Sequence, residues 1–361
     1  MIKPDKRFYS LESDFRSPYA RDRDRIIHSE SFRHLEYKTQ VFLNQEGDFF
    51  RTRLTHSIEV SQVARSISAQ LGLNENLAEA IALSHDLGHT PFGHVGGDAL
   101  DVILKENGFE SGFEHNFQSF RVVSSLEKRY KEFDGLNLTF ATLEGILKHS
   151  YPYKKPFLSA KLDDIFRLDY HPSLEAMVVD RADEIAYISH DIDDGLQSGL
   201  ITIDDLRKSE LIEEVLEKVK DEGIDENDSA LFRYRLSSHL INSLVYSLLD
   251  YSKHNINDEI LKATKPIPIG FNPKLETKIK KLKKILFQEL YQHEQIIRKM
   301  FAGKEAVRGL FNAFFEEPQL LSKEWRKRFK DEKTHRMIAD YITSLSDRYA
   351  MKLFNELYGR S

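Results

Sequence analysis

One short segment constrains what this chain can fold into more than any other. Residues 82–94 read ALSHDLGHTPFGH, with three histidines and an aspartate within about one helical turn and the loop after it. Just upstream, apolar side chains recur at i, i+1, i+4 and i+5 and place His85 at i+8, which predicts a helix whose buried face ends at His85. Gly88 and Pro91 then end the helix. A buried imidazole needs a polar partner, and we expect that partner to be a metal ion.

The composition decides which side chains can hold such an ion. The chain has 361 residues and no cysteine, so disulfides and thiolate metal sites are excluded and the ligands must be His, Asp or Glu. A length of 361 residues allows one large domain or two ordinary ones. The net charge of −6 argues against indiscriminate nucleic-acid binding.

The sequence carries no signal for a membrane. No apolar run is long enough to cross a bilayer, and the polar N-terminus lacks the pattern of a signal peptide. We therefore expect a cytoplasmic protein with no membrane partner.

Helical periodicity dominates the chain and predicts an all-α fold with little β structure. Residues 37–42 are an exception, because their pattern is β-like and a turn at 45–48 follows. The acidic, polar segment 202–228 predicts a surface excursion, and prolines between residues 266 and 273 mark the clearest break. We expect three parts, which are an N-terminal arm over 1–20, a helical core that carries the site over 21–262, and a C-terminal helical region over 263–361 that packs on the core.

Two further predicted helices carry polar side chains that suit the same site. One begins near Arg53, and its first turn places Arg53 and His56 on one side. The other spaces Asp183, Tyr187 and Asp191 at i, i+4 and i+8, along one helix face. Neighbouring carboxylates repel each other unless a cation or hydrogen-bond donors face them.

Four of these side chains form a ligand set for one divalent ion. Two imidazoles and two carboxylates suit Mn, Fe, Co, Zn, Ni or Mg. Such an ion acts as a Lewis acid and lowers the pKa of bound water. The alternative is a group of core side chains that satisfy one another by hydrogen bonds. The set is His56, His85, Asp86 and Asp183.

The lysine-rich segment 278–284 has two interpretations. Its lysines form the solvated face of a helix, or they contact an anionic effector or a nucleic acid. The solvated face is the commoner outcome for such a run, and we expect it here.

Taken in order, these motifs resemble those of the HD-domain phosphohydrolases, and more narrowly their deoxyguanosine-triphosphate triphosphohydrolase-like branch. The H…HD…D pattern alone is a weak signal, but here it stands among longer matches. The matching segments are Arg21–Ser29, Phe32–Arg33, Tyr37–Phe42, Arg53–Ser57, His85–His94, Glu114–Asn116, Ala182–Tyr187 and His190–Leu196.

The resemblance implies an all-α enzyme, with an HD-domain helical core and additional C-terminal helices. It implies hydrolysis of a deoxynucleoside triphosphate (dNTP) at the α-phosphorus, which yields a deoxynucleoside and triphosphate. The metal ligands implied by the match are His56, His85, Asp86 and Asp183. The catalytic positions are His94, His89 and His115, of which His89 also matches a phosphate contact. The substrate positions are Arg53 and Lys148 for phosphate, and Gln40, Tyr187 and Asp191 for the deoxyribose 3′-hydroxyl.

The residues around the catalytic histidine depart from the family pattern. The family places an acid three positions after this histidine, but here that position is Gly97 and the acid is Asp98. On a helix, positions i+3 and i+4 face the same side, so we expect Asp98 to orient His94. Without a helix there, His94 loses that partner. His149 stands where the family often has tyrosine, which leaves base recognition open.

Two other functions stay open. One is hydrolysis of a different nucleotide phosphoester, such as a nucleoside monophosphate. The other is a weakly active protein that binds nucleotides or single-stranded nucleic acid, which the Gly97 departure and the basic segment 278–284 favour. The resemblance also implies a homo-oligomer, often a hexamer, and a dNTP effector at a second site.

Overall fold

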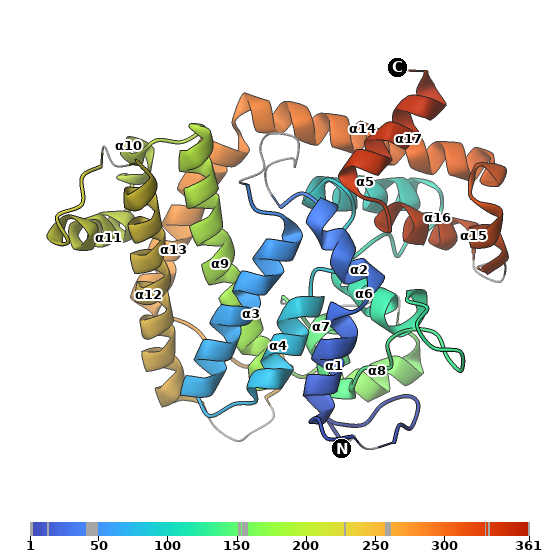
Figure 1. The fold of residues 1–361 in the computed structure, drawn as a ribbon, viewed down its shortest axis with the longest axis horizontal. Helices are drawn as coiled ribbons and strands as arrows, with labels where there is room; N and C mark the ends of the chain where they lie inside the picture. The colour runs from blue at the N-terminus through green and yellow to red at the C-terminus, as the bar shows by residue number, and fades with distance from the viewer. Residues whose placement is uncertain are drawn as a thin grey trace. The chain divides into compact units, whose positions relative to one another are not determined.

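The computed structural model describes residues 3–12, 14–40, 50–150, 153, 158–226, 229–256, 261–328, 330 and 333–359. Within these ranges the chain forms seventeen α-helices, short 3₁₀ and π turns and isolated β-bridges, but no sheet (Figure 1). The predicted all-α fold is confirmed.

The helices and short turns of the described residues follow one another along the chain in the order below. The α-helices are α1 (Pro18–Ile27), α2 (Glu30–His34), α3 (Arg53–Gln70), α4 (Glu75–Ser84), α5 (Gly93–Glu106), α6 (His115–Arg121), α7 (Phe140–Leu147), α8 (Ala160–Phe166), α9 (Leu174–Ser198), α10 (Ile203–Leu206), α11 (Glu210–Asp221), α12 (Ser229–Asn255), α13 (Pro273–Leu286), α14 (Glu294–Glu316), α15 (Lys323–Arg328), α16 (Thr334–Thr343) and α17 (Asp347–Tyr358). The short turns are η1 (Leu35–Tyr37), η2 (Val122–Leu126), η3 (Phe287–Tyr291) and η4 (Pro318–Leu320).

The chain divides into two compact units, each built from segments that are far apart in sequence. Unit 1 consists of Met1–Ser57, Leu83–Leu168 and Arg298–Ser361, and unit 2 of Ile58–Ala82 and Asp169–Ile297. The expected division at residues 20 and 262 stays a prediction.

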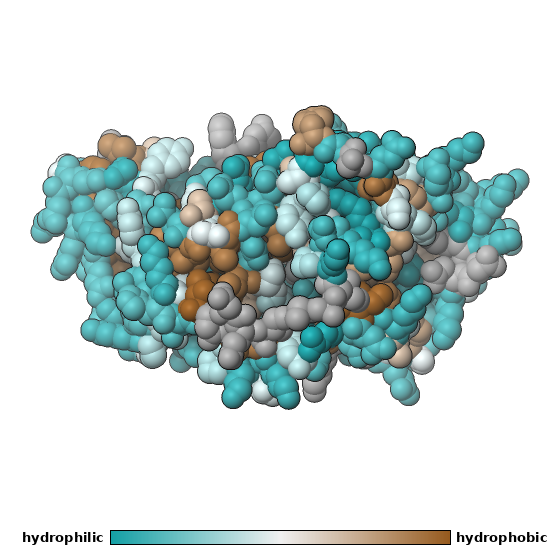
Figure 2. All heavy atoms as spheres, turned by 90° about the horizontal axis from the view of Figure 1, so that it is seen from below, coloured by the Kyte–Doolittle hydropathy of each residue, from teal (hydrophilic) through white to brown (hydrophobic). Residues whose placement is uncertain are grey.

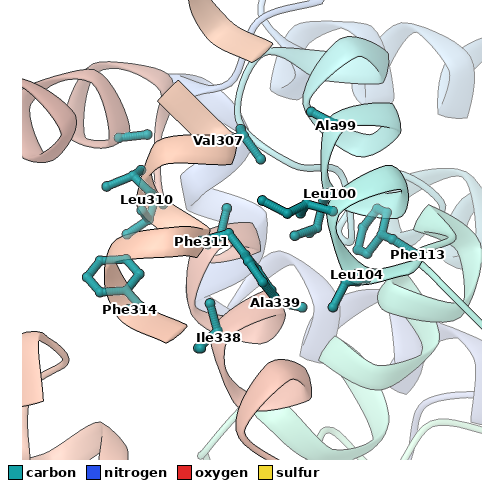
Figure 3. Packing of buried hydrophobic residues seen from close by; sticks show 14 of the residues in the cluster. Ala99, Leu100, Leu104, Phe113, Val307, Leu310, Phe311, Phe314, Ile338 and Ala339 are labelled. Atoms are coloured by element: carbon teal, nitrogen blue, oxygen red, sulfur yellow. The ribbon is translucent and has the colours of Figure 1, made fainter. Parts of the chain in front are cut away.

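The core of unit 1 joins helix α5 to the C-terminal helices. Leu100 of α5, Phe311 of α14 and Ile338 of α16 are fully buried in one apolar cluster (Figure 3). Burial of one such side chain contributes about 1.5–3 kcal/mol. This packing fixes helix α5, whose first two residues, Gly93 and His94, end the His-rich segment 82–94.

In unit 2, helix α9 packs against α12 and α13, and α11 packs against the same two helices. The expectation of a polar surface excursion over 202–228 is wrong, because this segment contains α10 and α11. Apolar side chains of α11 recur at i, i+1, i+4, i+5 and i+8 and are buried, although acidic residues surround them in the sequence. The buried residues are Leu211, Ile212, Val215, Leu216 and Val219.

The β-like pattern over 37–42 is only partly realised. Tyr37 ends the 3₁₀ turn η1, and Thr39 forms a single antiparallel bridge with Thr52. Residues 41 and 42 and the expected turn at 45–48 lie outside the described residues.

Hydrophilic side chains predominate on the face of the molecule that Figure 2 shows, where hydrophobic ones form small separate areas. Among the described residues, no helix is both long enough and apolar enough to span a membrane.

Candidate functional site

The first turn of α3 carries Arg53 and His56, where the sequence predicts them. The Thr52 hydroxyl caps this turn by accepting a hydrogen bond from the Thr55 amide at 3.3 Å. Arg53 and His56, which both belong to unit 1, are only 2% and 1% exposed, so the first turn of α3 buries both side chains.

His85 and Asp86 lie in the turn that follows α4. The Ser119 hydroxyl of α6 holds this turn, since it donates to the His85 carbonyl at 2.6 Å and accepts from the Gly88 amide at 2.8 Å. A Cβ at position 88 would lie 2.1 Å from the Ser119 nitrogen, so only glycine allows α6 to approach this closely. The His-Asp pair therefore sits in a turn of fixed shape.

His56, His85 and Asp86 converge within unit 1. Each offers one ligand atom, these atoms all lie within 4.8 Å of one another, and all three side chains are buried. The centroids of the His56 and His85 rings are 5.9 Å apart. Two imidazoles and a carboxylate at this spacing suit a borderline or hard divalent ion. The donor set therefore fits the metal centre that the sequence implies.

Asp86 is surrounded by cationic and polar groups. Arg53 Nη1 donates to Asp86 Oδ2 at 2.7 Å, and His89 Nε2 lies 3.0 Å from Asp86 Oδ1. Burial alone would raise the pKa of the Asp86 carboxyl, but His85, Arg53 and His89 together lower it well below its usual value. Burial and Arg53 also lower the pKa of the His89 ring well below its usual value. Asp86 is therefore ionised and His89 neutral at neutral pH.

Two buried polar atoms near this cluster make no hydrogen bond within the described residues. They are Arg53 Nε, a donor, and the side-chain oxygen of Gln40, an acceptor. An unpaired buried group of this kind costs about 1–3 kcal/mol, so a ligand that pairs with it is favoured. Both residues approach Gly93, where φ is 63° and a Cβ would lie 3.3 Å from Arg53 Nη2 and 3.8 Å from the Gln40 carbonyl.

A cavity of about 400 Å³ opens beside the predicted catalytic histidines. The centroid of the His89 ring lies 5.1 Å from that of His94 and 4.5 Å from that of His115. Because α5 begins at Gly93, His94 and Asp98 lie one turn apart on a continuous helix, and both line the cavity. This is the helical arrangement on which the expected role of Asp98 depends. The lining also includes Asp101, Lys105, Phe113 and Glu114.

His115 is the first residue of α6. The Glu114 carboxylate caps this helix, since it accepts from the amides of Asn116 and Phe117, each at 2.9 Å. Desolvation lowers the pKa of the His115 ring, although Glu114 opposes the shift. His115 is therefore neutral at neutral pH.

Lys148 lies at the end of α7 and is 1% exposed. Its ammonium pairs with the Glu144 carboxylate at 2.6 Å. Burial raises the pKa of Glu144, while Lys148 opposes that shift. The Lys148 ammonium, which is predicted to contact phosphate, is therefore already paired with Glu144 in this structure.

The predicted carboxylate face of α9 lies in unit 2, where Asp183, Tyr187 and Asp191 occupy successive turns of one helix. The Tyr291 hydroxyl donates to Asp191, and Lys283 Nζ lies 5.2 Å from the centre of the Tyr187 ring. Burial and acidic neighbours raise the pKa of Tyr187, so its hydroxyl stays protonated and can donate a hydrogen bond.

Two lysines of the basic segment 278–284 are engaged within unit 2. Lys278 pairs with Glu210 at 2.8 Å and also with Glu214, and Lys283 pairs with Glu184. The rest of the run agrees with a solvated helix face. The exposed lysines are Lys280, Lys281 and Lys284.

Three side chains that shape the site carry little signal in the sequence. The His149 ring lies 4.9 Å from the His85 ring, yet its position after Lys148 suggests only a departure from the family pattern. Lys38 and Asp347 are buried and bond to the loop that follows Asp86. Lys38 stands within a matching segment, whereas nothing in the local sequence around Asp347 points to the site.

Two family matches together cover most of the chain. Residues 53–188 match the HD domain, and residues 269–356 match the phosphohydrolase-associated domain. A protein of Wolinella succinogenes named deoxyguanosinetriphosphate triphosphohydrolase-like protein is 61% identical over 99% of this chain and all of its own length. Proteins of the same name from Nitrosomonas europaea and Geobacter metallireducens are 47% and 42% identical, over 95% and 98% of this chain and 91% of their own lengths.

Proposed function

Because the chain belongs to the HD-domain phosphohydrolases of the deoxyguanosinetriphosphate triphosphohydrolase-like family, we propose that this hydrolase acts on deoxynucleoside triphosphates. Water attacks the α-phosphorus, the bond to the 5′-oxygen breaks, and a deoxynucleoside and triphosphate leave. The proposal includes one divalent ion per site, which is Mn, Mg, Fe, Co, Zn or Ni. Its proposed ligands are His56, His85 and Asp86, with Asp183 as a fourth predicted from the sequence.

The single observation that carries this proposal is the buried guanidinium of Arg53 beside the His-Asp cluster. Nη1 is held by Asp86 at 2.7 Å, while Nε is buried and makes no hydrogen bond within the described residues. An oriented, desolvated guanidinium with a spare donor suits a phosphate oxygen. A divalent ion bound at the cluster supplies Lewis-acid catalysis at the same place.

The remaining residues supply a proton and hold the sugar. His94 lines the cavity at the start of α5, and we propose that it gives its proton to the departing 5′-oxygen while Asp98 orients its ring. The buried oxygen of Gln40 can accept a hydrogen bond from the 3′-hydroxyl. The remaining roles rest on the sequence match. They are the phosphate contacts of His89 and Lys148, the catalytic position of His115, and the sugar contacts of Tyr187 and Asp191.

The test is a turnover assay with each of the four dNTPs and with Mn²⁺ or Mg²⁺, in which the products are separated by anion exchange. We expect triphosphate and deoxynucleoside in equal amounts. Release of orthophosphate or pyrophosphate alone rules out this reaction, and turnover of nucleoside monophosphates favours a different phosphoester substrate. Nucleotide or single-stranded nucleic-acid binding without turnover, equal in wild type and Asp86→Ala, identifies a binding protein. The homo-oligomer and the dNTP effector stay predictions from the resemblance.

A further inference from the structure

The loop between Asp86 and α5 is held by two buried charged side chains from outside it. Lys38 Nζ donates to the His89 carbonyl at 2.6 Å and to the Thr343 carbonyl at 2.7 Å. Asp347 Oδ1 accepts from the Phe92 amide at 3.0 Å. Lys38 and Asp347 thus bracket residues 89–92, which lead from one predicted catalytic histidine towards the other.

Asp347 also holds the segment that carries Lys38. Its Oδ2 accepts from the Thr39 amide at 2.8 Å and from the Thr39 hydroxyl. Asp347 is the first residue of α17 and is 6% exposed, and all of these partners belong to unit 1. One carboxylate from the C-terminal helices therefore connects two segments of the site.

Phe92 has a backbone conformation that needs such support. Its φ of 62° and ψ of 23° are left-handed, which is unfavourable for a residue with a side chain and persists only where the surroundings impose it. Its amide is fixed by Asp347, and its ring packs on α14, where a Cβ on Gly303 would lie 2.6 Å from Phe92 Cγ. Helix α5 begins at the next residue, so Phe92 sets the start of α5 and the position of His94.

We propose that Asp347 is a positioning residue, which holds Phe92 and thereby fixes His94 relative to the substrate. Asp347 acts through its bonds to the loop at Phe92 and to the segment at Thr39, and not by touching the substrate. The kinetic part of the test rests on the proposed function, whereas the geometry of the loop is measured without turnover.

The first test compares two identical substitutions of buried carboxylates. In Asp347→Asn the amide nitrogen must face one of the donors that the carboxylate accepts, so the Phe92 or the Thr39 amide loses its partner. The matched control is Asp22→Asn. Asp22 is fully buried and accepts from the Thr139 amide at 2.9 Å and its hydroxyl at 2.6 Å, the same bonds as those from Thr39, but its partners lie outside the loop.

We expect Asp347→Asn to lower kcat about 10- to 100-fold while KM stays within about twofold, because a small displacement of a reacting group has that cost. Asp22→Asn also weakens the ion pair with Arg7, so we expect it to lose at least as much thermal stability but to keep its kcat at temperatures well below both melting points. Hydrogen exchange of residues 88–94 speeds up only in Asp347→Asn. Equal kcat losses in the two variants, or an unchanged kcat in Asp347→Asn, overturn the proposal.

If the wild type turns over no dNTP, the proposed function fails and hydrogen exchange alone decides this inference. Unchanged exchange over 88–94 in Asp347→Asn then refutes it.

A second pair of variants tests the loop if Asp347→Asn fails to fold. A Cβ on Gly303 meets the Phe92 ring, whereas a Cβ on Gly309, also in α14, would lie 2.4 Å from Phe354 of α17. Both substitutions by alanine crowd an aromatic ring, but only Gly303→Ala displaces Phe92. We expect a loss of kcat, with faster exchange over 88–94, in Gly303→Ala and not in Gly309→Ala. Equal effects of the two refute the role of Phe92.

Discussion

The ion pair between Arg53 and Asp86 can be broken to test how the site is held together. The Arg53 and Asp86 side chains are 2% and 6% exposed, and they pair at 2.7 Å. In Arg53→Met the Asp86 carboxylate stays buried but loses this guanidinium. Removal of one partner from a buried pair costs about 3–5 kcal/mol. Because His85 and His89 still face Asp86, we expect the lower end, about 3 kcal/mol of unfolding free energy in the metal-free protein.

A bound cation changes this result. When Mn²⁺ binds at Asp86, its charge replaces that of Arg53, so urea denaturation with Mn²⁺ should show a smaller difference between Arg53→Met and wild type. The control is Arg7→Met, which strips a guanidinium from the fully buried Asp22 but leaves the metal site intact, so its difference from wild type should not change with Mn²⁺. The pH dependence has a definite sign. Asp86 has a lowered pKa when folded, so the stability that its pairing contributes is present at neutral pH and is lost as pH falls through that pKa.

Two outcomes would refute this reasoning. One is a metal-free Arg53→Met protein that unfolds within about 1 kcal/mol of wild type, as for a solvent-exposed pair. The other is equal stabilisation of Arg53→Met and Arg7→Met by Mn²⁺, which would mean that the ion does not replace the charge of Arg53 beside Asp86.

Three further predictions concern single groups. Asp98→Asn should lower kcat about tenfold and leave Mn²⁺ affinity unchanged, as measured by steady-state kinetics and calorimetry; an unchanged kcat would remove Asp98 from the mechanism. His56→Ala should weaken Mn²⁺ binding in calorimetry, and chelation of the ion should abolish wild-type turnover; turnover that survives chelation would contradict the metal site. Burial and Arg53 lower the pKa of Lys38 to about 8, while Asp347 and Asp86 oppose the shift. The unfolded chain then holds this proton more tightly than the folded one, so wild type should gain stability relative to Lys38→Met between about pH 8 and about pH 10.5, as measured by urea denaturation; a constant difference would mean that Lys38 stays charged.

The parts of the site that could be predicted from the sequence are those set by local signals. The start of α3 at Arg53 and the single helix that carries Asp183, Tyr187 and Asp191 follow from caps and helical spacing within a few residues. The sequence left open whether a helix begins before His94, and the structure shows that α5 does so, as the role expected for Asp98 requires.

What could not be predicted depends on contacts between distant segments. Asp347 bonds to Thr39 across 308 positions of sequence, and no local pattern marks it. His149 approaches His85 only because α7 packs against α6. The prediction of a polar surface excursion at α11 was wrong for another reason. The acidic residues dominate the composition of this segment, although its apolar residues recur at helical spacing and are buried.

The central claim is that water attacks the α-phosphorus of a dNTP, and isotope labelling tests it most directly. Turnover in H₂¹⁸O with Mn²⁺, followed by mass spectrometry of the products, locates the oxygen that water supplies. We predict one ¹⁸O atom in triphosphate and none in the deoxynucleoside. Label in orthophosphate, in pyrophosphate or in the deoxynucleoside would contradict the account.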